Sequence, residues 1–458
     1  MDLVRLSVTS SAASAKSSSI GQRWVISLVF ALAALFLFVF PVRAQVTTET
    51  QKLVASDAQA GDQFGFSVAA STDVLAVGAP GKDVLFGTLI EAMGAVYIFT
   101  RDPNDGSWQE QTRLIPLDGG TPASGGAASL GESVATNGDF VVAGAPGERA
   151  VYIYKENGAG GWPQVQKIGR PGRNGFGSVL AISGNRLIVG AQRSALIFHY
   201  DTGKAIWEEV ETFTSSLVGS GFGSSVAIDG DSALVGSPAE VYMGEEAGAA
   251  HLFRWNGTTW EYDSAFHDDG VAAGEEFGHA VATAGTTLLV SASRVDLGGG
   301  AGKAFVFENK NDVWNEPQEL TAQDTLLSGE FGWSLALESD RAVVSDNYYD
   351  GCCGDVGRAY VFTRNANGWQ KAATLGASDS EFWDLLGSST ALSGDTVILG
   401  SAFEDEMGDG AGAAYVFELE EDLGGVAVPS MEGISTIVLV TALLSAGLLM
   451  REREPGDL

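Results

Sequence analysis

The chain has 458 residues, of which 58 are acidic and 26 basic, so its formal net charge is −32. This excess of negative charge repels nucleic acid and anionic membrane surfaces, which excludes nucleic acid as a partner. The only two cysteines are adjacent, so the fold must be stabilised by a hydrophobic core and not by a framework of disulfides.

Residues 1–44 are predicted to be a secretory signal peptide. Three basic residues precede an apolar run from Trp24 to Val42, and Val42-Arg43-Ala44 fits a small-residue cleavage site. The run is also long enough to be an uncleaved anchor, and both interpretations stay open. In either case the residues that follow are expected to be exported.

One cassette of three apolar elements recurs seven times within residues 45–423. The first copy reads Phe64-Gly65-Phe66-Ser67-Val68-Ala69, then Val77-Gly78-Ala79-Pro80, then Gly94-Ala95-Val96-Tyr97-Ile98-Phe99. The copies begin at Phe64, Leu130, Phe176, Phe222, Phe277, Phe331 and Leu386. Short runs rich in Val, Ile, Phe and Tyr, separated by Gly, Asp, Asn and Ser, are typical of strands joined by tight turns.

A fourth strand is predicted after the third in six of the copies. It starts at a tryptophan: Trp108, Trp162, Trp207, Trp260, Trp314 and Trp369. Six positions later comes an apolar residue, from Leu114 in the first copy to Leu375 in the sixth, and the residues between are mostly polar, as suits an exposed edge strand. Four strands in each of seven units predict an all-β fold, a seven-bladed β-propeller.

The seventh copy has no tryptophan strand after Phe417, and its fourth strand is predicted at the other end of the domain. Leu53 precedes Phe64 by the same interval that separates the fourth strand from the next Phe-Gly pair in later copies, such as Leu375 and Leu386. We therefore expect residues 48–55 to complete the last blade and close the ring. The alternative is that these residues form a disordered N-terminal linker.

The order of these motifs resembles the FG-GAP repeat family, best known from the head of the integrin α-chain. The resemblance covers about residues 46–418 and implies a propeller that is usually extracellular and often binds ligands or mediates adhesion. Integrin-type repeats commonly carry a calcium loop between their first two strands. Here those connections are short hairpin turns such as Asn137-Gly138-Asp139, so we expect no calcium site and no other cofactor.

The C-terminus is predicted to hold a linker with a sorting-type motif at 424–433, a transmembrane helix at 434–450 and a cytoplasmic tail at 451–458. Val428-Pro429-Ser430-Met431, the apolar segment and Arg451-Glu452-Arg453 resemble the PEP-CTERM-like tails, particularly the variant beginning Ile-Pro-Thr-Leu. That resemblance implies a sorting protease as a partner and a Gram-negative-type bacterium as the source. The alternative is a plain single-span anchor. Either way the propeller faces outward, at the cell surface or beyond it.

Cys352 and Cys353 lie between the second and third strands of the sixth copy, between flanking glycines. They are a candidate vicinal disulfide that would staple this loop; free thiols or an intermolecular bond stay open. The corresponding connections, 82–93, 240–247, 346–355 and 404–409, carry most of the surface variety, and loops on a rigid scaffold are where propellers bind. The last two are acidic and either attract Ca²⁺ weakly or form a solvated charge cluster.

Neither a Gly-x-Ser-x-Gly elbow nor a phosphate-binding loop is present. No metal-ligand spacing relates the histidines, which are His199, His251, His267 and His279. Serines recur after the Phe-Gly pair and are interpreted as repeat consensus and not as nucleophiles: Ser133, Ser225, Ser334 and Ser389. We therefore assign no catalytic, cofactor-binding or metal-binding residue.

These observations favour a non-enzymatic propeller, secreted or anchored at the surface, that binds an extracellular protein or glycan. The alternative is an extracellular polysaccharide-acting enzyme with its site in the central channel. Channel-facing carboxylates together with a histidine would favour the enzyme. An apolar or aromatic loop face would favour binding.

Overall fold

The computed structural model describes residues 46–86, 89–119, 127–217, 219–242, 244–267, 274–293, 302–322, 329–349 and 356–419. The predicted signal peptide, the sorting motif, the transmembrane helix and the Cys352–Cys353 pair all lie outside these ranges. Within them, no helix has the length and apolar character needed to cross a membrane.

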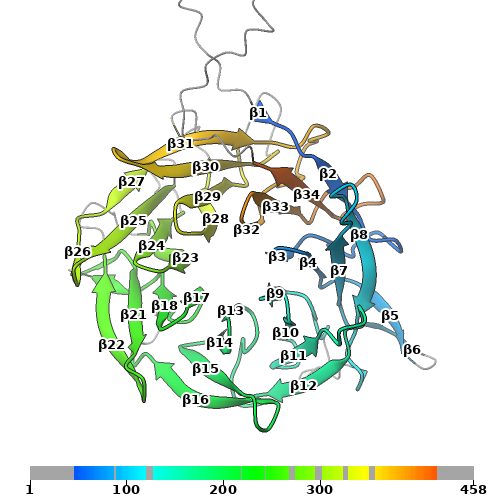
Figure 1. Ribbon diagram of the computed structural model, residues 1–458, viewed down its shortest axis with the longest axis horizontal. Coiled ribbons are helices and arrows are strands. Elements are labelled where there is room, and N and C mark those ends of the chain that lie inside the picture. The colour runs from blue at the N-terminus through cyan, green and yellow to red at the C-terminus, as the bar shows by residue number, and fades with distance from the viewer. Residues whose placement is uncertain are drawn as a thin grey trace, which may run out of the picture. The chain divides into compact units, whose positions relative to one another are not determined.

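The described residues form seven antiparallel β-sheets that follow one another around a ring, which confirms the seven-bladed propeller (Figure 1). From the inner strand outward, blade one is β3 (Ser67–Ala70), β4 (Val74–Ala79), β7 (Ala95–Arg101) and β8 (Trp108–Leu114). Blade two is β9 (Ser133–Thr136), β10 (Phe140–Ala145), β11 (Ala150–Lys155) and β12 (Gln164–Gly169). Blade three is β13 (Leu180–Ser183), β14 (Arg186–Ala191), β15 (Ser194–Asp201) and β16 (Ile206–Thr214).

The remaining blades keep the same order. Blade four is β17 (Val226–Asp229), β18 (Ser232–Ser237), β21 (Ala249–Trp255) and β22 (Trp260–Phe266). Blade five is β23 (Phe277–Ala284), β24 (Thr287–Ala292) and β25 (Lys303–Lys310), with β26 (Val313–Trp314) and β27 (Gln318–Leu320) outside. Blade six is β28 (Phe331–Leu337), β29 (Arg341–Asp346), β30 (Arg358–Asn365) and β31 (Gly368–Leu375). Blade seven is β32 (Ser389–Ser393), β33 (Thr396–Ser401), β34 (Ala413–Glu418) and β2 (Gln51–Leu53).

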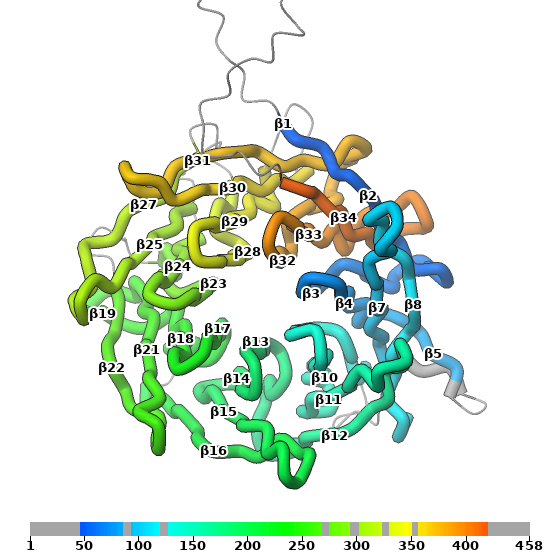
Figure 2. The backbone as a smooth tube through the Cα atoms, viewed as in Figure 1, coloured from blue at the N-terminus to red at the C-terminus, as the bar shows by residue number. Residues whose placement is uncertain are grey.

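The ring is closed by the N-terminal strand, as predicted. β2 pairs antiparallel with β34, with Leu53 opposite Ala414, and Figure 2 shows this blue segment beside the orange one. The predicted range 48–55 was too long, since the strand covers three residues. A second segment, β1 (Val46–Thr47), pairs in parallel with β31 of blade six. The sequence did not predict this pairing, because two exposed residues carry no periodic pattern.

The outer strands follow the predicted pattern in most blades. β8 buries Trp108 and Leu114 at its two ends and exposes alternate residues between them. The prediction was wrong in blade five, where the strand expected from Trp314 to Leu320 is split into β26 and β27. The sequence also did not predict two additional hairpins: β5 (Asp83–Phe86) with β6 (Leu89–Ala92), and β19 (Val241–Tyr242) with β20 (Glu245–Glu246).

Neighbouring blades approach closely at the glycines of the repeat. At Gly400 of β33, a Cβ atom would lie 1.9 Å from the carbonyl oxygen of Gly65 in blade one. The recurring serine of the first strand uses the same approach: the Ser389 hydroxyl donates to the Gly65 oxygen at 2.9 Å, and the Ser133 hydroxyl donates to Gly177 at 2.8 Å. These bonds between blades agree with the interpretation of the serines as repeat consensus.

Gly400→Ala is therefore expected to lower the free energy of unfolding by about 1–3 kcal/mol, because the added methyl group meets backbone that cannot move alone. The matched control is Gly169→Ala, also in a strand, where a Cβ atom would have no neighbour within 4 Å. Chemical denaturation followed by tryptophan fluorescence measures both. Equal stability of the two variants would contradict this account of the packing between blades.

Candidate functional site

Two sets of connections gather at one end of the ring. In blade seven, Ser389 at the start of the first strand lies opposite Gly400 near the end of the second. The connection that enters the first strand (376–388) and the one from the second strand to the third (402–412) therefore lie at the same end of the sheet. The other blades repeat this register, and we call this end of the propeller the loop end.

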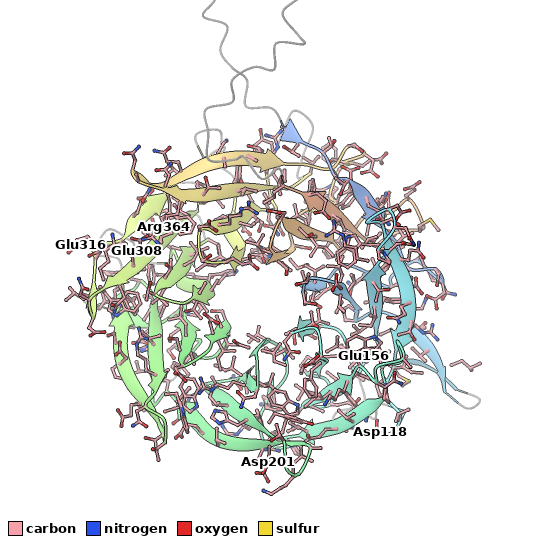
Figure 3. The ribbon with its side chains drawn as sticks, viewed as in Figure 1. Asp118, Glu156, Asp201, Glu308, Glu316 and Arg364 are labelled. Atoms are coloured by element: carbon pink, nitrogen blue, oxygen red, sulfur yellow. The ribbon has the colours of Figure 1, made fainter. Side chains whose placement is uncertain are left out.

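The central channel is a cavity of about 340 Å³ lined by the first strands of all seven blades. Figure 3 shows the side chains arranged around this central opening. At the loop end, the residue directly after each Phe-Gly or Leu-Gly pair lines the channel in blades two to seven: Glu132, Ser178, Ser224, His279, Trp333 and Ser388. Phe66 holds this position in the first copy and is partly exposed. The variable position of the motif thus sets the chemistry of the channel mouth.

Two of these residues form an aromatic pair. The rings of His279 and Trp333, from blades five and six, lie 5.0 Å apart. The indole nitrogen of Trp333 donates to the Ser388 carbonyl oxygen at 3.2 Å, and His279 Nδ1 lies 3.4 Å from Glu276 Oε2. The pair is held by both neighbouring chain segments, so the channel mouth has a preformed aromatic side.

Glu132 is the only acidic residue among the described residues that line this cavity at the loop end, whereas Asp229 and Glu338 line a cavity at the opposite ends of the first strands. Burial raises the pKa of the Glu132 carboxyl group above the ordinary value. It belongs to blade two, whereas His279 belongs to blade five. The arrangement is one carboxylate among serines, a histidine and a tryptophan, and not a pair of carboxylates.

Three of the carboxylates labelled in Figure 3 hold a turn or a neighbouring blade. Asp201 accepts a hydrogen bond from the Gly203 amide at 2.8 Å. The Glu156 carboxylate accepts from two glycine amides of its own turn. Glu308 of blade five lies 2.7 Å from Arg364 of blade six, which links the two blades at the rim. These groups serve structure and are already paired.

The loops of blade seven expose large apolar side chains at the loop end. Phe382 and Trp383, in the connection that enters the first strand, are 59% and 57% exposed, and their rings lie 6.3 Å apart. Phe403 and Met407, in the connection between the second and third strands, are 44% and 49% exposed. We call these four residues the blade-seven patch. Sequence reasoning treated 404–409 only as an acidic loop and missed the patch.

A lysine of the closing strand contacts the acidic loop 404–409. Asp379, Glu404 and Glu406 bring carboxylate oxygens within 4.8 Å of one another, a spacing that suits a cation. Lys52 Nζ lies among them, at 2.7, 2.9 and 2.7 Å respectively. Although burial opposes its charge, these hydrogen bonds raise the pKa of Lys52. Its ammonium group takes the place that a metal ion would need, so the cluster ties the closing strand to blade seven.

Asp384 lies beside this cluster and is 4% exposed. Burial raises the pKa of its carboxyl group to about 6, and the negative charges of Glu404, Asp405 and Asp379 add to the effect. The Glu381 amide donates to Asp384 Oδ2 at 2.6 Å and opposes it. Because the folded state holds this proton more tightly than the unfolded state, the stabilisation is present at low pH and is lost as the pH rises through about 6.

Asp384→Asn is therefore expected to raise the free energy of unfolding at pH 8 by about 1–2 kcal/mol, because the amide keeps an acceptor for Glu381 without a charge. The gain should vanish near pH 4, where the native carboxyl group is protonated. Urea unfolding across this pH range measures it. The exposed neighbour Asp405→Asn is the control, and a gain that does not depend on pH would refute the assignment.

The histidines lie in separate parts of the ring. His199 packs against Trp255, with ring centroids 5.0 Å apart, and His251 Nε2 lies 2.8 Å from Glu240 Oε2. His267 stacks on Tyr242 with centroids 4.0 Å apart. Of the four, only His279 lines the channel. The structure therefore brings no two of these histidines together.

The comparisons with known proteins bear on the repeats. The FG-GAP repeat model matches residues 47–99, 207–253, 260–307, 314–362 and 369–417, more than half of the chain. No curated protein matches the chain. Among solved structures, Sqt1 of Saccharomyces cerevisiae has 10% identity and a TM-score of 0.45, covering 82% of this chain and 100% of its own. A protein from Lactobacillus plantarum has 14% identity and a TM-score of 0.44, covering 71% and 87%.

Proposed function

Because the chain belongs to the FG-GAP repeat family, we propose that it is a non-enzymatic binding propeller, displayed outside the cell, whose loop end takes a protein or glycan ligand. The observation that carries the proposal is the blade-seven patch. Contiguous exposed apolar surface is rare on soluble proteins and marks interaction sites. Here two aromatic rings and two further large apolar side chains stand on adjacent loops of one rigid sheet.

The channel supports binding in preference to hydrolysis. Glycoside hydrolysis ordinarily needs two carboxylates flanking the scissile bond. At the loop end, the described lining supplies Glu132 as its one carboxylate, together with hydroxyl groups and the aromatic pair of His279 and Trp333. Such a surface can donate and accept hydrogen bonds and bury a ring, which is what recognition requires.

We propose that residues 1–44 direct export and that 434–450 hold the propeller at the membrane, with the sorting motif of 424–433 as the signal for a protease. The excess of acidic residues suits solubility outside the cell. Fractionation of cells that express the full chain tests this, with the propeller expected at the surface or in the medium. Recovery of the mature protein in the cytoplasm would refute it.

The binding role is tested by probing glycan arrays and surface extracts with the propeller. Replacing Trp383 and Phe403 together by serine is expected to weaken capture at least about tenfold, since aromatic anchors dominate binding energy. The matched control is Tyr262→Ser on the outer strand of blade four, where the ring is equally exposed. Capture that is unchanged in the double variant would contradict the proposal. Turnover of a polysaccharide that disappears in Glu132→Gln would favour the enzymatic alternative.

A further inference from the structure

Blade three is cut short at the loop end. Its second and third strands are joined by two residues only, Gln192 and Arg193, because Ala191 already pairs with Ser194. In blades one and four, the same connection carries the hairpins β5–β6 and β19–β20. The Gln192 amide donates to the Asn174 carbonyl oxygen at 2.8 Å, which fixes the short turn against the connection that enters the blade.

The short turn leaves a hollow made of two adjoining cavities. An outer cavity of about 690 Å³ and an inner one of about 600 Å³ share Gln192 and Arg193 as lining residues. The inner cavity also shares Ser178 and Ser224 with the central channel. The two cavities therefore form one groove, the blade-three groove, which runs from the channel mouth across the rim.

The charge of this groove is opposite to that of the protein. Arg170, Arg173 and Arg193 line the outer cavity, and none of the described residues that line either cavity is acidic. Acidic residues outnumber basic ones by 58 to 26 in the whole chain. A groove of three guanidinium groups in such a chain is an attractive site for anions in an otherwise repulsive surface.

Contacts within the chain hold the arginines in place but leave some of their N–H groups able to donate further hydrogen bonds. Arg173 donates to the Ser194 hydroxyl at 3.0 Å, and Arg193 reaches two backbone carbonyl oxygens at 3.3 and 3.5 Å. Arg170 pairs with Glu209 at 2.5 Å. Burial opposes the charge of Glu209, yet the bonds from Arg170 and Thr212 and the charges of Arg170 and Arg173 lower its pKa. A guanidinium group has five donors, so Arg173 and Arg193 can each bind a carboxylate.

Beside the arginines, the groove offers neutral hydrogen-bonding groups: Asn174, Gln192, Thr214, Ser215 and Ser224. The groove is lined by turns and by strand ends only, Ala191, Ser194 and Thr214, so no strand edge runs along it for an extended peptide to join. Building on the binding role proposed above, we infer that the blade-three groove binds an acidic polysaccharide, with carboxylates on Arg173 and Arg193 and sugar hydroxyls on the groups between.

The test measures binding of the propeller to polygalacturonate by calorimetry, with methyl-esterified polygalacturonate, dextran and polyglutamate as comparison polymers. We expect binding to polygalacturonate that weakens as salt is added, because the contacts are ionic. Arg173→Gln and Arg193→Gln are each expected to weaken it about tenfold, the effect of losing one charge-assisted bond. Arg193→Glu should weaken it further. Arg254→Gln in blade four is the control: Arg254 is half-buried, as Arg173 is, and lies 3.7 Å from Asp263.

Each other outcome overturns the inference. Equal binding of the esterified polymer or of dextran would show that carboxylates are not recognised. Equal binding of polyglutamate would reject a polysaccharide as the ligand. Absence of binding to polygalacturonate, or variants that bind like the native protein, would reject the groove. The proposed function fails separately, since it depends on the Trp383 and Phe403 variants; circular dichroism confirms that the arginine variants fold.

Discussion

Replacing Leu53 by aspartate is expected to abolish cooperative folding of the propeller. Leu53 is 3% exposed and packs with Phe64 and Val416, so it belongs to the core between blade seven and blade one. Removing a buried leucine side chain costs about 2–5 kcal/mol, and an unpaired buried carboxylate adds several more. That total approaches the whole stability of a typical domain, about 5–15 kcal/mol.

The matched control is Val46→Asp, which makes the same chemical change in the other N-terminal strand. Val46 is exposed and pairs only with the edge of blade six. The substitution Val46→Asp should change the free energy of unfolding of the protein by less than about 0.5 kcal/mol, as substitutions at other surface positions do. Far-ultraviolet circular dichroism during urea unfolding compares the two. A Leu53→Asp protein that unfolds like the Val46→Asp protein would mean that the ring does not depend on β2.

Lys82→Met is expected to have the second largest effect, about 3–5 kcal/mol of destabilisation, because it leaves a buried carboxylate without its partner. Lys82 Nζ lies 2.7 Å from Asp62 Oδ2, and both side chains are 3% exposed. The ammonium group also donates to the Asp57 carbonyl oxygen at 2.5 Å.

The double variant Lys82→Met with Asp62→Asn separates the charge from the packing. The amide still offers an oxygen to the Gln59 amide, which donates to Asp62 in the native protein at 2.8 Å. We expect the double variant to recover most of the stability, since replacing both charges removes the uncompensated one. Lys204→Met is the surface control, because its ion pairs with Asp201 and Glu208 are exposed to solvent, which screens them. If the double variant were as unstable as Lys82→Met, the destabilisation would come from lost packing and not from the unpaired charge.

The blade count and the ring closure could be predicted from the sequence because both are repetitive. The Phe-Gly pairs set the inner strands, and the interval from Leu53 to Phe64 identified the closing strand, which the pairing of Leu53 with Ala414 confirms. The prediction that each fourth strand starts at a tryptophan failed at Trp314, whose strand is interrupted, and at Trp162, which lies two residues before its strand. A repeated sequence pattern predicts the structural features that all copies have in common.

The site could not be predicted because it depends on what the copies do not share. The residue after the Phe-Gly or Leu-Gly pair differs between copies, and only the closed ring shows that six of these positions, from Glu132 to Ser388, line one channel. Blade three has no hairpin between its second and third strands, and the sequence shows only a short turn there. The three arginines of the blade-three groove come from two different connections. Nothing in the sequence around Lys52 indicates its three carboxylate partners, which lie more than 300 residues later in the chain.

The pairing of β2 with β34 has a consequence for how the chain matures. Thr50 bonds to Val416, 366 positions later, so β2, which is synthesised near the start of the domain, pairs with β34, the last strand of the described residues. Until the final repeat has been synthesised, the preceding repeats can fold, but the ring stays open. The backbone groups of β2 that bond to β34 then have no partner. An N-terminal fragment that lacks the last copy should therefore be a target for holding chaperones and proteases, and release of the whole chain is the step that commits it to its working form.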